Sequence, residues 1–311
     1  MTLQQLKYAV AVAECGNVTA ASQKVFISQP SLTTAVHELE KEIGITIFSR
    51  TNKGVVVTNE GDEFLGYARQ VLEQASLLEE KYLGTAQKQT RFSVTCQHYS
   101  FAVNAFVDVI KQFGGSEYDY TLRESQTSRI IDDVSRLKSE IGILYMNKSN
   151  SEVISKLLKK NDLVFTELCT AKPHVFISNT NPLAAKTKIT LEDLNPFPYL
   201  TYEQGEYNSF YFSEEPLPNI DHKLNIKVSD RATLFNLLIG LNGYTVCSGV
   251  IDSGLNGSSI IARPLELDDF MIIGTVTHKN AALSRYAHAY LEALKKYIWP
   301  DENYLHLTCG S

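Results

Sequence analysis

The chain has 311 residues, of which 44% are hydrophobic and 21% are charged, an ordinary composition for a globular protein with two or three domains. Its formal net charge of −6 argues against a protein that coats nucleic acid or an anionic membrane through bulk charge, so any such contact must be local. The first residues lack the features of a secretory signal, and no run approaches the roughly 18 apolar residues that span a bilayer. We therefore expect a cytoplasmic protein with no membrane partner.

Cysteines and common catalytic motifs give no sign of a metal site or of catalysis. The five cysteines stand singly, without a C-x-x-C pair, which matches neither a disulfide framework nor a zinc site. The chain has no P-loop and no G-x-G-x-x-G, H-E-x-x-H or G-x-S-x-G motif. The sequence therefore predicts neither an enzyme nor a bound cofactor.

The first 60 residues predict three short helices joined by tight turns. Apolar residues recur at helical spacing up to Gly16, which ends the first helix. A second helix begins after Asn17 or Thr19, either of which can cap it. The third helix starts at Ser28, its expected cap, and Pro30 falls in the first turn, where its missing amide hydrogen costs nothing.

The third helix has one apolar face and one polar face. Its apolar stripe has spacings of three and four residues and consists of Leu32, Ala35, Val36, Leu39 and Ile43. The opposite face is small and rich in hydrogen-bonding groups, which suits a helix end that approaches base edges in a major groove: Gln29, Ser31, Thr33, Thr34, His37 and Lys41. Two β-like runs follow at 45–50 and 54–58, and they predict a hairpin whose tip carries Arg50 and Lys53, able to contact phosphates.

A long helix is predicted from its cap, Thr58, to about Lys88. Its apolar residues follow alternating steps of four and three, as in a heptad repeat: Phe64, Ala68, Val71, Ala75, Leu78 and Tyr82. A helix of about 45 Å with one narrow seam must bury that seam, and a second copy of the helix is the simplest partner. The alternative is a long helix that lies along its own domain.

Beyond the polar stretch at 85–90, strand patterns alternate with helix patterns. Strands are expected at 91–96, 120–125 and 141–146, with helices between them, which is the βαβ rhythm of a parallel sheet. A second set of strands follows, then a strand at 270–278 and a last amphipathic helix from Ala281 to about Tyr297. We expect two α/β lobes with a cleft between them, and open α/β sheets bind ligands outside the carboxyl ends of their strands.

Residues 19–50 resemble the LysR-type transcriptional regulators. The paired alanines, the SQPSL opening of the third helix, the LE pair, the following glycine and the IFSR ending stand at that family's spacing. The resemblance continues through TNEGDEFLGYARQVLEQ, IGILY, HVFISNTNPLA and IGLNGYTVCSG. It therefore covers nearly the whole chain.

The resemblance implies an α/β fold class with an N-terminal winged helix-turn-helix, a long linker helix and a two-lobed, periplasmic-binding-protein-like effector domain. The expected parts are a DNA-binding domain at 1–60, a linker or dimerisation helix at 61–88, lobe I at 89–165 and 270–300, and lobe II at 166–269. The implied partners are double-stranded promoter DNA and a small-molecule effector. The implied assembly is a homodimer through the linker helix that forms a homotetramer, with RNA polymerase as a candidate partner.

In regulators of this type the start of the third helix reads the bases, which here implies Gln29, Pro30, Ser31, Thr33 and Thr34 as DNA-binding residues, with Arg50 and Lys53 on the hairpin. Many relatives have a basic residue where this chain has Thr34, so no base preference is carried over. Residues 1–60 contain five basic and five acidic residues, a net charge of zero. Binding is therefore expected to depend on local phosphate contacts, helix-terminal amides and oligomerisation.

The resemblance also implies an effector pocket built from loops at the strand ends. The implied residues are Gln97, His98, Tyr99, Ser100, Thr127, Ser128, Tyr145, Thr201, Tyr202, Asp230 and Thr245. The stretch QHYS precedes a helix whose free amides favour an anion, so a small carboxylate or similar anion is the expected effector. For His98 the alternative is a strand-end histidine bonded to backbone.

Two other functions are weighed against a ligand-responsive regulator. A cytoplasmic solute-binding protein would use the two-lobed fold alone, but the amino-terminal helices speak against it. A redox or metal sensor would use Cys96 and His98, since thiolate and imidazole are good soft ligands. These two residues supply only half of such a site.

Overall fold

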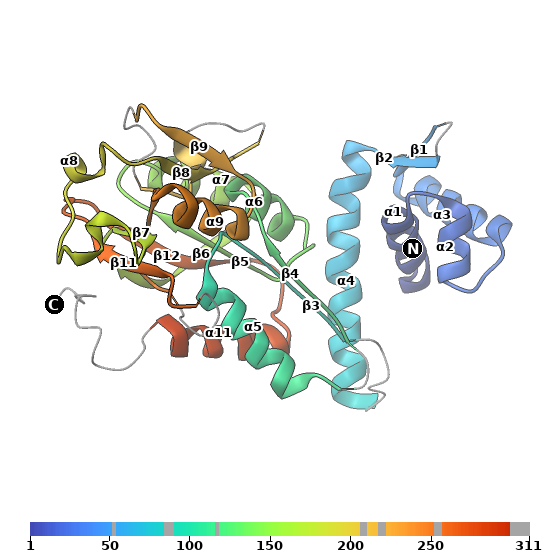
Figure 1. Ribbon diagram of the computed structural model, residues 1–311. Coiled ribbons are helices and arrows are strands. Elements are labelled where there is room, and N and C mark those ends of the chain that lie inside the picture. Colours follow the sequence, from blue (N-terminus) through green and yellow to red (C-terminus); the bar gives the residue numbers. More distant parts are fainter. Residues whose placement is uncertain are drawn as a thin grey trace. The chain divides into compact units, whose positions relative to one another are not determined.

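The computed structural model describes residues 1–51, 54–83, 90–115, 118–205, 210–216, 222–251 and 257–298. The chain divides into two compact units, Met1–Lys88 and Gln89–Ser311, each described here by itself (Figure 1). None of the helices in the described ranges combines the length and the apolar character that crossing a membrane requires.

The first unit consists of four helices and one antiparallel hairpin. Its elements are α1 (Leu3–Cys15), α2 (Val18–Lys24), α3 (Gln29–Ile43), β1 (Phe48–Thr51), β2 (Gly54–Val57) and α4 (Asn59–Leu83). The three short helices, the hairpin and the long helix expected from periodicity are all present. Lys53 and residues 84–88, over which the long helix was expected to continue, lie outside the described residues.

Side-chain and glycine caps set where the short helices begin and end. The Thr2 hydroxyl accepts a hydrogen bond from the Gln5 amide at the start of α1, and Gly16, at φ 65°, ends that helix in a left-handed conformation. Asn17 rather than Thr19 caps α2, because its side-chain oxygen accepts a bond of 2.7 Å from the Ala20 amide. Local chemistry thus accounts for the tight succession of these helices.

The core of the first unit joins all four helices. One buried cluster consists of Leu6, Ala9, Leu39, Ile47, Leu65 and Ala68. A second consists of Ala11, Val12, Ala21, Leu32 and Val36. Members of the predicted apolar stripe of α3 occur in both clusters, so burial of this stripe fixes the orientation of α3, and its polar face is left toward solvent.

Two side chains fasten the hairpin to the helices on either side of it. One carboxylate oxygen of Glu40, in α3, accepts hydrogen bonds from the amides of Ile47 and Phe48 at 2.7 and 3.0 Å. The hydroxyl of Thr58 donates to the Thr46 carbonyl at 2.6 Å and accepts from the Gly61 amide at 2.9 Å. The hairpin is therefore held at both of its ends.

The helix α4 buries only the first part of its predicted seam within this unit. Ala68 is buried, whereas Val71, Leu78 and Tyr82 are 44%, 62% and 70% exposed. These three exposed positions belong to the same heptad pattern.

The second unit contains two five-stranded sheets among its described residues, and its first half builds most of one of them. The elements of this half are β3 (Thr90–Cys96), α5 (Ser100–Phe113), β4 (Tyr118–Glu124), α6 (Thr127–Ser135), β5 (Ile141–Met146), α7 (Ser151–Lys160) and β6 (Leu163–Ala171). The second half consists of β7 (His174–Ser178), η1 (Pro182–Ala185), α8 (Leu191–Leu194), β8 (Tyr199–Tyr202), η2 (Phe210–Phe212), β9 (Asn225–Val228), α9 (Arg231–Leu241), β10 (Tyr244–Cys247), β11 (Ile260–Pro264), β12 (Met271–His278) and α11 (Arg285–Ile298).

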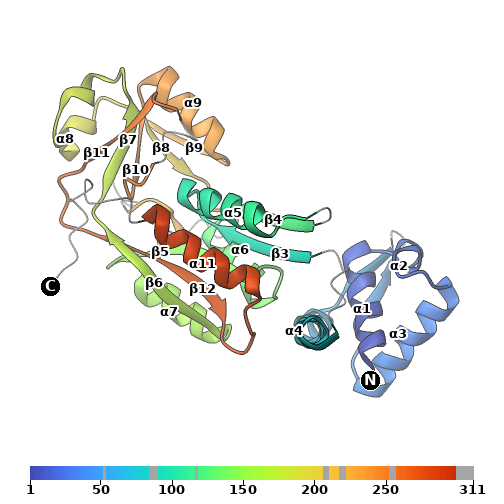
Figure 2. The same cartoon turned by 90° about the horizontal axis from the view of Figure 1, so that it is seen from below.

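The first sheet has the order β4-β3-β5-β12-β6 and forms lobe I. As predicted, β3, β4 and β5 are parallel, but β12 runs antiparallel to both β5 and β6, so the sheet is mixed. The reason is that the chain enters β12 directly from lobe II, without the crossover helix that a parallel return needs. Helices α5 and α11 pack against one face and α6 and α7 against the other (Figure 2).

The second sheet has the order β11-β7-β10-β8-β9 and forms lobe II. The buried Leu234 and Leu238 of α9 lie in one cluster with Leu200 of β8. On the other side, η1 and α8 contribute Leu183 and Leu194 to a cluster with strand residues of β7, β8 and β10. Both faces of this sheet are therefore covered.

The chain passes between the lobes twice, at 172–173 and at 266–270. The two passages start side by side, because the Leu265 amide donates to the Pro173 carbonyl at 3.0 Å. Strand β6 remains in the first sheet up to Ala171, where it pairs with Met271. The boundary expected between residues 165 and 166 therefore cuts a strand of lobe I, and the lobes meet at about residue 172 instead.

Candidate functional site

The exposed start of α3 gathers most of the residues expected to read DNA. Ser28 caps the helix by accepting from the Ser31 amide at 3.2 Å. Gln29, Pro30, Ser31 and Thr34 are exposed, and Thr33 is half-buried. The Thr33 hydroxyl donates to the Gln29 carbonyl at 2.9 Å, which leaves its oxygen lone pairs as acceptors. Arg50 lies in β1, paired with Val55.

The turn before α3 carries an aromatic residue in an unusual conformation. Phe26 has a φ of 56° and is 92% exposed. The left-handed conformation costs a residue other than glycine about 1–2 kcal/mol, and this side chain buries almost nothing in return. Sequence reasoning missed Phe26, because its backbone conformation is set by the turn.

Two cavities of the second unit share His98 as a lining residue. The larger is about 340 Å³ and is lined by residues of both lobes: His98, Glu124, Ser125, Gln126, Arg129, Glu203 and Ser229. The smaller is about 50 Å³, and its lining includes five of the expected effector residues: His98, Tyr99, Ser100, Tyr202 and Thr245. Ligand sites for small molecules have volumes of about 300–1,000 Å³, so the smaller cavity can admit a metabolite only when one of the side chains that line it moves away.

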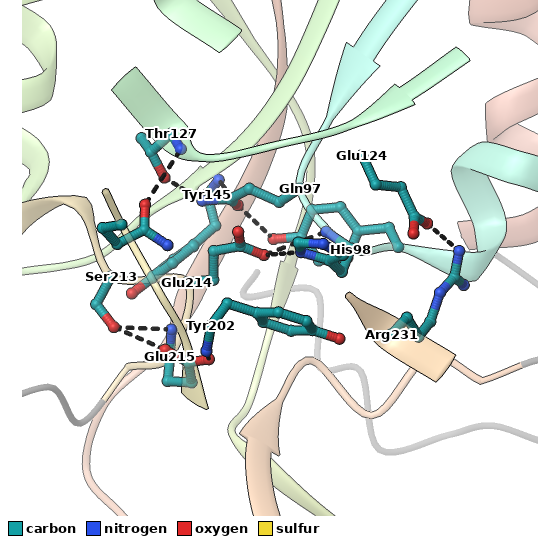
Figure 3. A network of polar contacts seen from close by, with 12 residues as sticks. Gln97, His98, Glu124, Thr127, Tyr145, Tyr202, Ser213, Glu214, Glu215 and Arg231 are labelled. Carbon is teal, nitrogen blue, oxygen red and sulfur yellow. Dashed lines mark hydrogen bonds and ion pairs between the residues drawn. The ribbon is translucent and has the colours of Figure 1, made fainter. Parts of the chain in front are cut away.

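A carboxylate of the chain itself is bound at His98 (Figure 3). One oxygen of Glu214 lies 2.8 Å from His98 Nδ1 and accepts a hydrogen bond of 3.2 Å from the His98 amide. A carboxylate only accepts, so Nδ1 carries the proton in this pair. The His98 ring stacks on Tyr202 with centroids 3.7 Å apart and an interplanar angle of 3°. The ring nitrogen Nδ1 of His98 is therefore bonded to a side chain, and not to backbone as the alternative interpretation expected.

A second buried carboxylate lies next to the first. One oxygen of Glu215 accepts from the Tyr202 amide and the other from the Ser213 hydroxyl, both at 2.8 Å. Burial, and after it the neighbouring Glu214, raises the pKa of Glu215 to about 8. The smaller cavity is thus lined by two acidic side chains that the sequence analysis did not identify.

Three expected effector residues form a buried network instead of lining either cavity. Gln97 donates to the Thr127 hydroxyl at 2.7 Å and accepts from the Tyr99 hydroxyl and the Tyr145 amide at 2.9 and 3.0 Å. The Thr127 hydroxyl in turn donates to the Phe212 carbonyl at 2.9 Å. Gln97 and Thr127 therefore connect the strand β5, through the Tyr145 amide, with the segment that contains Phe212.

Three further expected residues are not among those that line the two cavities: Ser128, Thr201 and Asp230. Asp230 caps α9, where its two oxygens accept from the amide and the hydroxyl of Thr233 at 2.8 and 2.7 Å. The next residue, Arg231, forms an ion pair with Glu124 of lobe I. This pair joins the lobes beside the smaller cavity, and no local pattern in the sequence indicated it.

The geometry argues against a redox or metal sensor at Cys96 and His98. Cys96 is fully buried, and burial raises the pKa of its thiol to about 12, so the reactive thiolate is not available. His98 is already paired with Glu214. Within the described residues, no group of three or more His, Cys, Asp and Glu side chains is placed to hold a metal ion.

Comparisons with known proteins agree with the two units. Residues 3–62 match the family described as "Bacterial regulatory helix-turn-helix protein, lysR family", and residues 87–299 match "LysR substrate binding domain". The chain is 27% identical to the HTH-type transcriptional regulator AlsR of Bacillus subtilis (strain 168) over 78% of this chain and 77% of that regulator. It is 25% identical to a probable RuBisCO transcriptional regulator of Trieres chinensis over 88% and 85% of the two chains.

A solved structure has the same fold. Full-length OxyR from Pseudomonas aeruginosa superposes with a TM-score of 0.66 at 20% identity and covers 95% of this chain and 98% of that one. The family matches span most of the chain, and the relatives are transcriptional regulators rather than enzymes. The chain therefore belongs to the LysR family and is a ligand-responsive, DNA-binding transcriptional regulator.

Proposed function

We propose that this regulator binds a small anionic metabolite, such as a carboxylate, between the two lobes of its second unit. The observation that supports this is the carboxylate already held by the amide and the ring of His98. A position that binds one carboxylate with a backbone donor and an imidazole donor suits another. Ser100 and Thr245, which line the smaller cavity from the two lobes, supply hydroxyl groups for the same ligand.

DNA is contacted, in this proposal, by the exposed start of α3. Gln29, Ser31, Thr33 and Thr34 present hydrogen-bonding groups to base edges, and Pro30 and Phe26 supply apolar surface for sugars and thymine methyl groups. Arg50 and Lys53 are assigned to phosphates. Because residues 1–60 have no net charge, tight binding requires several copies of this domain on one site.

We propose that those copies are held together by α4. The exposed Val71, Leu78 and Tyr82 continue the heptad seam and fit a second copy of the helix. The proposed assembly is a homodimer that pairs into a homotetramer, with RNA polymerase as a further partner, in the cytoplasm where bacterial promoters are found. The proposed parts are the DNA-binding domain at 1–60, the linker at 61–88, lobe I at 89–171 with 270–300, and lobe II at 172–269.

A thermal-shift screen of small carboxylates against the full-length protein tests the effector class. A ligand at 100 times its dissociation constant should stabilise the protein by about 2.7 kcal/mol. Titration calorimetry of the best ligand should then show at least about a tenfold loss of affinity, or about 1.4 kcal/mol, in the Ser100→Ala, Thr245→Ala double variant.

Thr201→Ala is the matched control for that measurement. Thr201 is a half-buried threonine of lobe II that is not among the residues lining either cavity, so its loss should leave the affinity unchanged. Equal affinity in the double variant and in wild type would show that the ligand lies elsewhere. If only cationic compounds stabilise the protein in the screen, the proposal of an anionic effector is wrong.

A further inference from the structure

Glu214 lies in a segment between strands β8 and β9 of lobe II, and this segment contacts lobe I. The described part of this segment is residues 210–216. Phe212 packs against the lobe I cluster that contains Ile130 and Leu144, and its carbonyl accepts from Thr127. Glu215 accepts from the backbone of Tyr202 in β8. The 210–216 segment is therefore bonded to both lobes, and Glu214 extends from it to His98 (Figure 3).

We propose that Glu214 is a tethered internal ligand: its carboxylate occupies the anion position at His98 when effector is absent, and an anionic effector has to displace it. This inference rests on the proposed function, because it concerns the same site and the same class of ligand. It adds the identity of the competitor. It also adds a reason why binding changes the protein, since displacement removes the bonds that hold this segment to His98.

The bonding of Glu214 is incomplete, which makes displacement feasible. One of its oxygens accepts both bonds from His98, while the other, Oε1, is buried without a hydrogen-bond partner among the described residues. The residue is only 8% exposed. A buried carboxylate with one unpaired oxygen loses its hydration without full compensation. A free ligand that bonds with both of its oxygens, or retains water on one, would be held better.

The neighbouring side chains of Glu215 and Gln204 also leave Glu214 incompletely stabilised. The adjacent carboxyl of Glu215 is fully bonded and buried beside Glu214, so any negative charge on it repels the Glu214 carboxylate. Gln204, two residues after β8, is 4% exposed, and its side-chain amide nitrogen has no hydrogen-bond partner among the described residues. The donor Gln204 Nε2 and the acceptor Glu214 Oε1 are thus both buried, and they are not paired to each other. In a purely structural contact, buried polar atoms are expected to be paired.

Chemical rescue tests the tethered ligand directly. The variant Glu214→Ala removes the carboxylate and leaves a space of its size beside His98, so free acetate should bind there. The measurement is the melting temperature of the full-length protein against acetate concentration, with sodium chloride at matched ionic strength. A tether gives an effective concentration in the millimolar range or above, so we expect acetate to bind Glu214→Ala at least about tenfold more tightly than wild type.

Three controls separate anion recognition from general effects. Acetamide has the shape of acetate without its charge, and it should not stabilise Glu214→Ala. Glu192→Ala removes an exposed glutamate of lobe II, and it should respond to acetate as wild type does. Glu214→Gln retains the size of the side chain and replaces the anion with a weaker neutral acceptor, so its affinity for acetate should lie between those of wild type and Glu214→Ala.

If Glu214→Ala does not fold, the comparison of Glu214→Gln with wild type decides. Equal acetate affinity in the variants and in wild type, or equal stabilisation by acetate and acetamide, overturns the inference. The proposed function fails separately, when no carboxylate stabilises the wild-type protein, and the acetate difference can still be observed in that case. Conversely, a carboxylate effector that binds wild type and Glu214→Ala equally well preserves the proposed function and refutes the tether.

Discussion

Replacing Glu40 by alanine should destabilise the DNA-binding unit and displace its hairpin. One oxygen of Glu40 accepts hydrogen bonds from the amides of Ile47 and Phe48, where the chain leaves α3 and enters β1. Ile47 is fully buried and Phe48 half-buried, so water replaces the lost acceptor poorly. A buried donor left unpaired costs about 1–3 kcal/mol, so the two together should cost about 2–6 kcal/mol, with the half-buried Phe48 amide contributing the smaller part.

Scanning calorimetry of the full-length protein measures this cost. For a domain of about 60–100 residues, each kcal/mol lowers the melting temperature by about 4–8 °C, and the first unit has this size. The transition of that unit should therefore fall by at least about 8 °C in Glu40→Ala. The melting temperature of Glu40→Gln should lie between those of Glu40→Ala and wild type, because an amide oxygen still accepts a hydrogen bond, though without charge.

Glu38→Ala is the matched control, since Glu38 is an exposed glutamate two residues earlier in the same helix. It should leave the transition unchanged. Retardation of promoter DNA should weaken in Glu40→Ala and persist in Glu38→Ala, because Arg50 lies on the strand that Glu40 holds. If the two variants melt at the same temperature, the Glu40 bonds contribute nothing, and the account of how the hairpin is held is wrong.

Three other results are expected. Phe26→Asn should raise the melting temperature, because asparagine tolerates a φ of 56° better, and should weaken DNA binding; an unchanged melting temperature would show that the turn is not strained. Val71→Glu places a charge on the exposed seam, so light scattering should show a smaller assembly, and an unchanged mass would place the interface elsewhere. Since the pKa of Glu215 is raised from 4.5 to about 8, its proton is bound in the folded chain and lost on unfolding within that range, so stability should fall as pH rises through it. Glu215→Gln should lose this slope in melting temperature, and an equal slope would refute the assignment.

The first unit could be predicted closely because its boundaries depend on local chemistry. Ser28 and Thr58 accept the first free amides of their helices, and Gly16 ends α1 in a conformation that glycine adopts without cost. Each of these signals involves residues within four positions of one another. The choice between Asn17 and Thr19 could not be made from the sequence, because both residues can cap and only the packed turn selects one.

The second unit was predicted less completely, for two physical reasons. The helix α7 is mostly polar and buries only Ile154 and Leu158, so its periodicity was not recognised and the following strand β6 was missed. The direction of β12 depends on the connection that precedes it and not on its own residues. A strand of the same composition fits a parallel or an antiparallel position when both faces are covered.

The cleft shows how far local reasoning extends. The family resemblance implied Ser100, Tyr202 and Thr245 as effector residues, and all three line the smaller cavity. Glu214 follows a short 3₁₀ helix in a segment without periodicity, and glutamate is rarely buried without a partner, so a sequence reading places it in solvent. The fold instead brings it to His98 across 116 positions of the chain, and one of its oxygens has no hydrogen-bond partner in the part of the chain that the structure describes. A position where the local rule fails in this way is where function is expected to have overridden stability, and the proposed displacement of Glu214 is such a function.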